Sequence, residues 1–152
     1  MSHITTVEIQ VTDIDALAQA CSLMGVELRQ QQKTFRSFGG ARTKCEMAIV
    51  DPANAEAYEL GLVRAKANGH GQEAGWKIQM DNWQGGHGMN AKVGNDAGLL
   101  LQRYGLCVAR KQAMKQGMAV REEKLADGRI RLVCEPRQAL AAAGGGFVGS
   151  GF

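Results

Sequence analysis

Apolar and polar residues alternate along residues 4–11, which read ITTVEIQV. A spacing of two is typical of a half-buried β-strand, in which every second side chain faces the core. The side chains expected to be buried are Ile4, Val7, Ile9 and Val11. We therefore expect the chain to open with a strand.

The apolar spacing changes to three and four residues over positions 12–25, which predicts an amphipathic helix. Thr12 or Asp13 would cap its first turn, and Gly25 would end it. The apolar residues that would share the buried face of this helix are Ile14, Leu17, Cys21 and Met24.

Four further short stretches predict strands. They are residues 26–35, 43–51, 57–65 and 76–83. The first two would be joined through a turn at Gly39 and Gly40. The last two would form a hairpin around residues 68–71, whose sequence is NGHG.

A second and longer helix is predicted from Asn95 to Gln116. Either Asn95 or Asp96 would cap it, and Gly117 would end it. Its expected apolar face consists of Leu100, Leu101, Tyr104, Cys107 and Val108.

Residues 118–135 carry the strongest hairpin pattern in the chain. Alternating strands flank Asp127–Gly128, a dipeptide favoured in two-residue turns. Opposite charges would face one another across this turn on a solvated side, with Glu122 and Glu123 against Arg129 and Arg131.

The order of these elements predicts the fold class. One strand, a helix, four strands, a helix and two strands do not alternate as a parallel sheet requires. We expect an α+β fold, with a mostly antiparallel sheet and two helices packed on one of its faces. The other face would be charged and would face water or a partner. Residues 1–137 would form a single domain, and residues 138–152 an Ala/Gly-rich flexible tail.

Four segments, in this order and spacing, resemble the hypothetical chloroplast reading frame 35 family of cyanobacteria, plastids, other bacteria and phages. They are MSHITTVEIQVTDIDALAQACSLMGVE at the start, YELGLV, DNWQGG, and the stretch from LLQRYGLCVARKQAMKQGMAV to RIRLVCEPR. The resemblance covers residues 1–137. It implies a small soluble domain of unknown function and supplies no catalytic residues. Members are often encoded near AAA-type ATPases, which implies an accessory role beside such a machine.

Composition agrees with an ordinary globular protein, since hydrophobic residues make up 45% of the chain and charged residues 22%. The N-terminus does not read as a signal peptide, and no apolar run reaches the length of a membrane span. We expect a cytoplasmic protein that does not bind membranes. The isolated cysteines are then expected to be small core residues rather than a disulfide or metal framework: Cys21, Cys45, Cys107 and Cys134.

The glycine-rich stretch at residues 81–95, DNWQGGHGMNAKVGN, leads into the second helix and could cradle a phosphate. It lacks the spacing of known phosphate loops, and Asp96 at the helix start would repel an anion. A mobile connection, with Trp76 and Trp83 packed on the sheet, is the favoured interpretation.

The candidate catalytic groups do not form a set. His3, His70 and His87 have no metal-ligand spacing and nothing that would orient their rings. An enzyme centred on His87 and Asp81 is the least favoured hypothesis, so no catalytic residue, metal or cofactor is assigned, and we do not expect an enzyme.

Residues 29–44 carry five basic residues and no acid, although the formal net charge is only +3. Two phenylalanines interleave with these charges, so the segment could follow a phosphate backbone and stack bases. The residues of this candidate nucleic-acid site are Arg29, Lys33, Phe35, Arg36, Phe38, Arg42 and Lys44. A solvated hairpin whose phenylalanines face the core is the alternative.

These observations favour an accessory or adaptor protein that acts by binding another protein, with an ATPase as one candidate partner. A nucleic-acid-binding domain that uses residues 29–44 is the second hypothesis.

Overall fold

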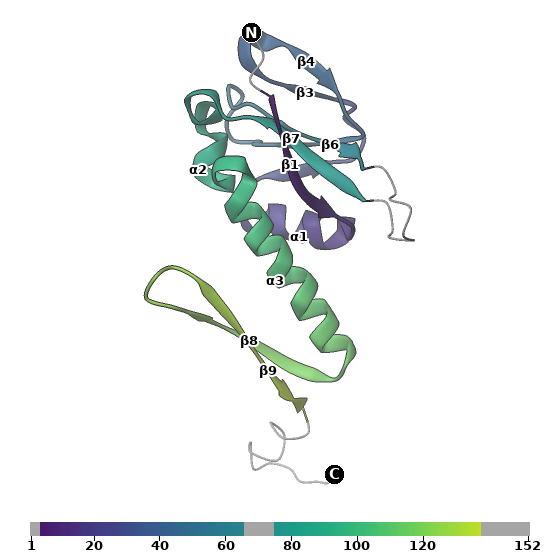
Figure 1. Ribbon diagram of the computed structural model, residues 1–152, viewed down its shortest axis with the longest axis vertical. Helices are drawn as coiled ribbons and strands as arrows, with labels where there is room; N and C mark the ends of the chain where they lie inside the picture. The colour runs from purple at the N-terminus through teal and green to yellow at the C-terminus, as the bar shows by residue number, and fades with distance from the viewer. Residues whose placement is uncertain (1–3, 66–74, 138–152) are drawn as a thin grey trace. The chain divides into compact units, whose positions relative to one another are not determined.

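The computed structural model describes residues 4–65 and 75–137, and it divides into two compact units, the first ending at Tyr104 and the second beginning at Gly105 (Figure 1). The first unit contains a five-stranded sheet in the order β1-β7-β6-β5-β2, in which every neighbouring pair is antiparallel. Its strands are β1 (Ile4–Val11), β2 (Glu27–Arg29), β5 (Met47–Val50), β6 (Leu60–Arg64) and β7 (Trp76–Asp81). The α+β class and the antiparallel sheet are as predicted.

Strand β1 forms as predicted, but one of its apolar residues faces solvent. Val7 pairs with Ile78, and Val11 pairs with Trp76. The chain therefore advances four residues along β1 while it advances only two along β7. This bulge interrupts the alternation of side chains. Val7 and Val11 are buried, whereas Ile9, which lies in the bulge, is 59% exposed. The expected burial of Ile9 was therefore wrong, because simple alternation assumes an unbroken register.

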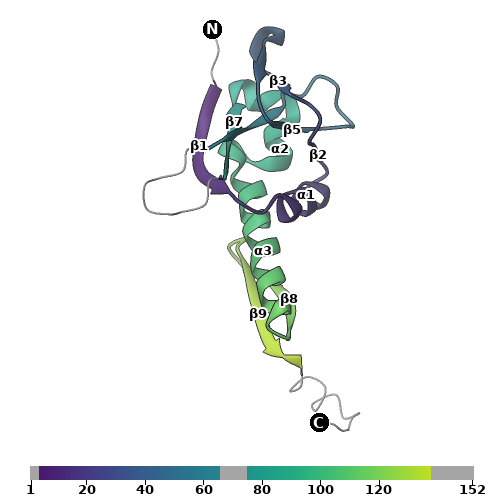
Figure 2. The ribbon, with the colours of Figure 1, turned by 90° about the vertical axis from the view of Figure 1, so that its right-hand side faces the viewer.

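Helix α1 (Ile14–Leu23) follows β1 closely (Figure 2). Asp13 is its cap, since its side chain accepts a hydrogen bond of 3.0 Å from the backbone N–H of Ala16. Leu17 and Cys21 are fully buried, and Ile14 and Met24 are half-buried. The Tyr104 hydroxyl accepts hydrogen bonds from the backbone N–H groups of residues 12 and 13, each 3.1 Å, so the second long helix meets the start of α1.

The strands predicted over residues 26–35 and 43–51 each break in two. Their sheet-side halves are β2 and β5, which pair with each other. Their outer halves, β3 (Thr34–Arg36) and β4 (Arg42–Lys44), form a separate two-stranded ribbon (Figure 1). The predicted turn at Gly39 and Gly40 is present, with φ of +71° and +76°.

Phe35 holds this ribbon against the sheet, and its side chain is fully buried in a cluster with Ala48 and Val50. Beside this cluster, β6 carries Gly61, where a Cβ atom would lie only 2.2 Å from the Phe35 ring. The β3–β4 ribbon therefore covers part of the sheet face that was predicted to be charged. Elsewhere that face is polar, as Glu8 and Lys77 form an ion pair of 3.1 Å between β1 and β7.

Between β7 and the second long helix lie short helical segments where a loop was predicted. They are a 3-10 segment (Trp83–Gly88), α2 (Met89–Val93) and a 3-10 turn (Asn95–Ala97). Met89 and Val93 are buried, which anchors α2 despite its length. The pattern did not reveal α2, because its two apolar anchors stand among glycines and polar residues.

Helix α3 (Gly98–Lys115) begins three residues later than predicted. Leu100, Leu101, Tyr104 and Cys107 are buried as expected, and Val108 is half-buried. The predicted cap at residue 95 or 96 was wrong. Asp96 has a φ of +53°, and its carboxylate accepts a hydrogen bond of 2.8 Å from the Asn82 side chain.

The second unit contains the later part of α3 and the predicted hairpin of β8 (Met118–Lys124) and β9 (Ile130–Pro136). Residues 125–129 connect the strands, so Asp127 and Gly128 lie in a five-residue loop and not in a two-residue turn. Glu123 pairs with Arg131 as expected, whereas Glu122 pairs with Arg110 on α3. Residues 1–137 were predicted to form a single domain, which stays a prediction. The hairpin lies in the second compact unit and adds no strand to the five-stranded sheet.

No helix in the part of the chain that the structure describes is long and apolar enough to cross a membrane. The predicted turn at residues 68–71, the tail at 138–152, His3 and His70 lie outside the described residues.

Candidate functional site

The basic segment 29–44 forms the β3–β4 ribbon, and the structure removes one aromatic residue from the candidate nucleic-acid site. Phe35 is fully buried, so its ring is not available to stack on a base. That assignment was wrong because Phe35 covers the sheet at Gly61. Phe38 is half-buried and meets Trp83 edge-on, with 5.7 Å between ring centroids. Trp83 thus packs against the tip of the ribbon, and it is 41% exposed.

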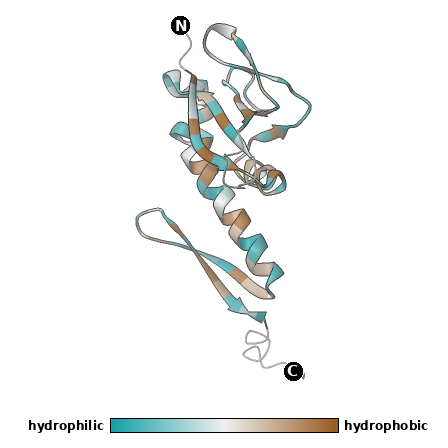
Figure 3. Cartoon of the chain, turned by 45° about the vertical axis from the view of Figure 1, so that its right-hand side comes forward, coloured by the Kyte–Doolittle hydropathy of each residue, from teal (hydrophilic) through white to brown (hydrophobic). Residues whose placement is uncertain are grey.

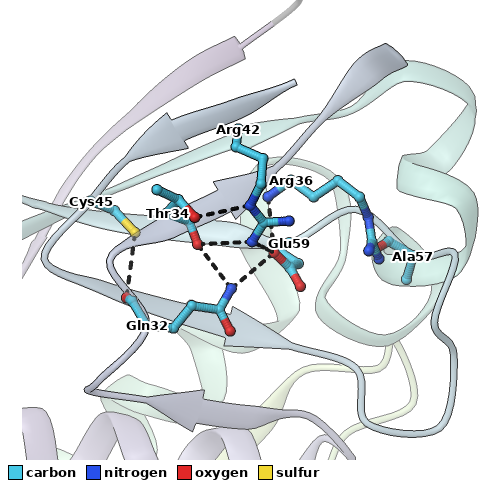
Figure 4. Close-up of polar contacts among 7 residues, drawn as sticks. All are labelled: Gln32, Thr34, Arg36, Arg42, Cys45, Ala57 and Glu59. Atoms are coloured by element: carbon cyan, nitrogen blue, oxygen red, sulfur yellow. Dashed lines mark hydrogen bonds and ion pairs between the residues drawn. The ribbon is translucent and has the colours of Figure 1, made fainter. Parts of the chain in front are cut away.

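Glu59 ties several residues of the ribbon together (Figure 4). Its Oε1 atom accepts hydrogen bonds from the Gln32 side chain (3.0 Å), the Arg36 backbone N–H (2.9 Å) and the Arg42 guanidinium (3.2 Å). The Glu59 side chain is only 11% exposed. Arg42 therefore has a structural role, since a mostly buried carboxylate needs a charged partner and several donors.

The other basic residues of the segment have partners other than Glu59 or line a separate surface. Arg29 pairs with Glu27 on its own strand, and Lys33 donates to the backbone oxygens of Gln30 (3.2 Å) and Glu46 (2.8 Å). Lys33, Lys44 and Arg64 line an open cavity of about 430 Å³, together with Thr34, Cys45, Glu46 and Val63. Three of its seven lining residues are cationic and one is acidic, so we call this surface the basic groove.

Residues 84–87 form a left-handed turn within the glycine-rich stretch. Gln84, Gly85, Gly86 and His87 all have φ between +47° and +65°, with ψ from 23° to 42°. Left-handed backbone costs about 1–2 kcal/mol for each residue with a Cβ atom, and it occurs as single residues far more often than as a run. The stretch was predicted to be a mobile connection, and the structure gives it a defined and strained backbone conformation.

Backbone and ring contacts hold the left-handed turn in place. The Tyr58 backbone N–H donates to the Gly86 oxygen (2.9 Å), and the Asn54 side chain donates to the His87 oxygen (3.0 Å). The His87 ring lies against Tyr58, with ring centroids 4.7 Å apart. His87 thus has a fixed position, which the sequence did not indicate.

Asp81 joins the ribbon tip to the left-handed turn. Its side chain is buried, with one oxygen accepting a hydrogen bond from the Phe38 backbone N–H (3.1 Å) and the other from the Trp83 backbone N–H (2.9 Å). Burial and the nearby Asp81 charge together raise the pKa of Tyr58 above its usual range. Asp81 is therefore a structural acceptor at the end of β7.

The ribbon tip and the left-handed turn flank an open, shallow cavity of about 360 Å³, which we call the tip cavity. Its lining residues are Arg36, Ser37, Gly39, Gly40, Ala55, Glu56, Tyr58 and His87. The Ser37 hydroxyl is buried and has no hydrogen-bond partner in the structure. The sequence did not single out Ser37 or Tyr58, because a serine before a glycine turn and a tyrosine near a strand are both commonplace.

The tip cavity does not contain an assembled catalytic set. A nucleophilic serine needs a histidine base within hydrogen-bond reach and a third group that orients the base. Ser37 makes no hydrogen bond to His87, and both oxygens of Asp81 accept from backbone N–H groups. What this geometry offers instead is a binding pocket with a cation, an imidazole and an unused hydroxyl.

No cluster of three or more metal-ligating side chains occurs among the described residues. Cys21 and Cys107 are buried, as expected of core residues. Cys45 is half-buried and Cys134 is exposed, so the expectation of a core position was wrong for Cys134, which lies on a hairpin without a core of its own.

The cysteines are expected to differ widely in reactivity. At about pH 8, iodoacetamide should modify Cys134 first and Cys45 more slowly, because burial and then Glu59 raise the pKa of the Cys45 thiol. Cys21 should react only after unfolding, since burial raises its pKa to about 12. Mass spectrometry of digests would follow each site, and Cys134→Ser should remove the fastest phase. Modification of Cys21 in the native protein as fast as Cys134 would contradict the fold.

No protein-family model, curated protein or solved structure matches this chain. The resemblance to the chloroplast reading frame family therefore stays a prediction.

Proposed function

We propose that this chain is an accessory protein that acts by binding another protein, and that the β8–β9 hairpin is its docking element. One observation carries the proposal. Neither strand of the hairpin has a single buried side chain. A two-stranded hairpin is only marginally stable in water, and three strands or a covering layer are needed for independent stability. Helix α3 contacts the hairpin through Arg110, which reaches Glu122 and the Val120 oxygen, and a partner would complete the covering that this one helix leaves partial.

The two faces of the hairpin differ in chemistry, and both strands carry apolar and polar residues (Figure 3). One face carries the half-exposed side chains of Met118, Val120, Ile130 and Leu132, together with Glu122 and Lys124, and on this side Glu122 pairs with Arg110 of α3. The opposite face carries an ion-pair network in which Glu123 contacts Arg121 and Arg131. The charged face is satisfied within the hairpin, so the apolar face is the side on which a partner would gain most.

The hairpin also has two outer edges, whose backbone groups point away from the β8–β9 pairing. Such edges accept an additional strand from another chain. The proposed partner is therefore a protein that adds an extended segment to one edge, with its apolar side chains on the Val120 and Leu132 face. The family resemblance makes an AAA-type ATPase the first partner to test.

Nucleic-acid binding is the second candidate function, and the basic groove favours it. Among the described residues, no acidic side chain lies within ion-pairing distance of Lys33 or Lys44, and Arg64 lines the same groove. A phosphate backbone is a natural ligand for such a group of cations. Against it, Phe35 is buried and Arg42 is held by Glu59.

One experiment separates the two candidates. The tagged full-length chain, Leu132→Lys, Arg131→Ala and the double variant Lys33→Gln/Lys44→Gln would each be used to capture partners from the native cells, with and without nuclease. The recovered ATPase or other protein would then be purified and its affinity measured. Adaptor function predicts that Leu132→Lys lowers affinity at least about tenfold. Arg131→Ala, whose side chain lies on the opposite face of β9, should bind as the unmodified chain does.

The opposite pattern would support the second candidate. If every partner is lost with nuclease, and the chain binds single-stranded DNA in a salt-sensitive manner that Lys33→Gln/Lys44→Gln weakens, the hairpin proposal is overturned. Equal affinities of Leu132→Lys and the unmodified chain for a purified partner would also overturn it.

A further inference from the structure

We propose that the tip cavity binds a phosphate or carboxylate group of a small molecule, with Arg36, Ser37 and His87 as its ligands. This site is independent of the hairpin and of any protein partner. Three features of the first unit support it, and each concerns a different residue.

The first feature is the Ser37 hydroxyl. It lines the tip cavity, is fully buried and lacks a hydrogen-bond partner. Nearly all buried polar side chains in folded proteins are hydrogen-bonded, and each exception calls for an explanation. An oxyanion in the cavity would accept the hydrogen bond that Ser37 can donate. An alanine at this position would fold without the unsatisfied group.

The second feature is the Arg36 guanidinium. It donates to the Ala57 backbone oxygen, which orients the side chain beside the cavity. No carboxylate in the described part of the chain forms an ion pair with Arg36. A guanidinium has five N–H donors in a planar fork that matches phosphate and carboxylate oxygens. Its remaining donors are the main source of affinity in the proposed site.

The third feature is the strained backbone of His87. Its φ of +52° would suit glycine, and the chain already has glycine at positions 85, 86 and 88. A histidine here makes the turn less stable than a fourth glycine would. Strain of this kind is often found where it positions a functional side chain. The strained turn brings the imidazole to the cavity wall, where a ring N–H can donate to an anion.

One charge opposes the proposed ligand. Glu56 also lines the tip cavity, and its side chain is exposed, so water screens its repulsion. Asp81 is close to the ribbon tip, but both of its oxygens accept hydrogen bonds from backbone N–H groups. Glu56→Gln tests this repulsion, because a cavity without the carboxylate charge should bind the anion more tightly than the cavity of the unmodified chain.

The experiment uses the full-length chain, with inorganic phosphate and acetate as separate probes in isothermal titration calorimetry. Saturable binding of phosphate, of acetate or of both supports the site and identifies the group that it prefers. Ser37→Ala and His87→Gly should each weaken binding by about tenfold, because each removes a donor to a charged acceptor. Both should also raise the thermal unfolding temperature measured without ligand.

Gln84→Gly is the matched control. Gln84 has a φ of +47° in the same left-handed turn but does not line the tip cavity. Its replacement should raise thermal stability as His87→Gly does and leave anion binding unchanged. The proposal is overturned if neither probe binds saturably up to about 10 mM. It is also overturned if Gln84→Gly weakens binding as much as His87→Gly, since the turn and not the imidazole would then be responsible.

Discussion

Phe35→Ala is expected to lower the free energy of unfolding by about 3–5 kcal/mol, the usual cost of deleting a buried aromatic side chain. The Phe35 ring fills the space between the ribbon and the sheet, against Ala48 and Val50. Without it, β3 and β4 lose the apolar contact that holds them to the sheet. Urea denaturation followed by tryptophan fluorescence would measure the change.

A double-mutant cycle with Gly61 tests the geometry of this contact. Gly61→Ala alone should cost about 1–3 kcal/mol, because its Cβ atom would lie 2.2 Å from the Phe35 ring. In the Phe35→Ala background the same substitution should cost much less, since the new methyl group would occupy the vacated space. Additive effects would show that Phe35 and Gly61 do not touch. Gly105→Ala is a control, because nothing lies within 4 Å of the Cβ position at Gly105.

Asp81→Ala is expected to lower the free energy of unfolding by about 3 kcal/mol or more. The substitution would remove the acceptor of two backbone N–H groups, those of Phe38 (3.1 Å) and Trp83 (2.9 Å), at a buried position. The ribbon tip and the left-handed turn would then separate, and Trp83 would become more accessible to a fluorescence quencher such as acrylamide. An unchanged midpoint of urea denaturation would contradict the structural role given to Asp81.

Asp81→Asn removes the charge and keeps one of the two acceptors. It should cost less stability than Asp81→Ala, since the amide oxygen can still accept one of the two backbone hydrogen bonds, and it should lower the pKa of Tyr58 because the Asp81 charge contributes to raising it. A group with a raised folded-state pKa stabilises the fold below its unfolded pKa and loses that contribution as pH rises through the folded pKa. Alkaline unfolding above about pH 10 should therefore depend less steeply on pH in Asp81→Asn. Ultraviolet titration of the phenol would follow Tyr58, with Tyr58→Phe identifying its signal.

The fold class could be predicted because most elements carry their own local pattern. The α1 helix has its cap at Asp13, and the β8–β9 hairpin has alternating strands around Asp127 and Gly128. Such signals depend on neighbours within a few residues, which the sequence contains in full. The buried faces of α1 and α3 followed from spacing for the same reason.

The candidate site could be predicted only in part. The sequence pointed to the basic segment and to the glycine-rich stretch, and the structure brings parts of both together at the tip cavity. It gave no indication that Ser37 would be buried without a partner or that His87 would lie against Tyr58. These features depend on contacts between residues that are far apart in the sequence, such as Tyr58 and His87, which no local pattern encodes.

The sequence alone determined the α+β class, the order of the long elements and the buried faces of the two long helices, because propensity, capping and periodicity act over short distances. Only the tertiary structure decided that β2 and β5 part from β3 and β4, that Phe35 is buried against Gly61, and that Ile9 turns outward. It also decided that the hairpin has no core of its own. Each of these outcomes depends on which distant surface a segment meets, and that is set by packing and register rather than by the residues of the segment itself.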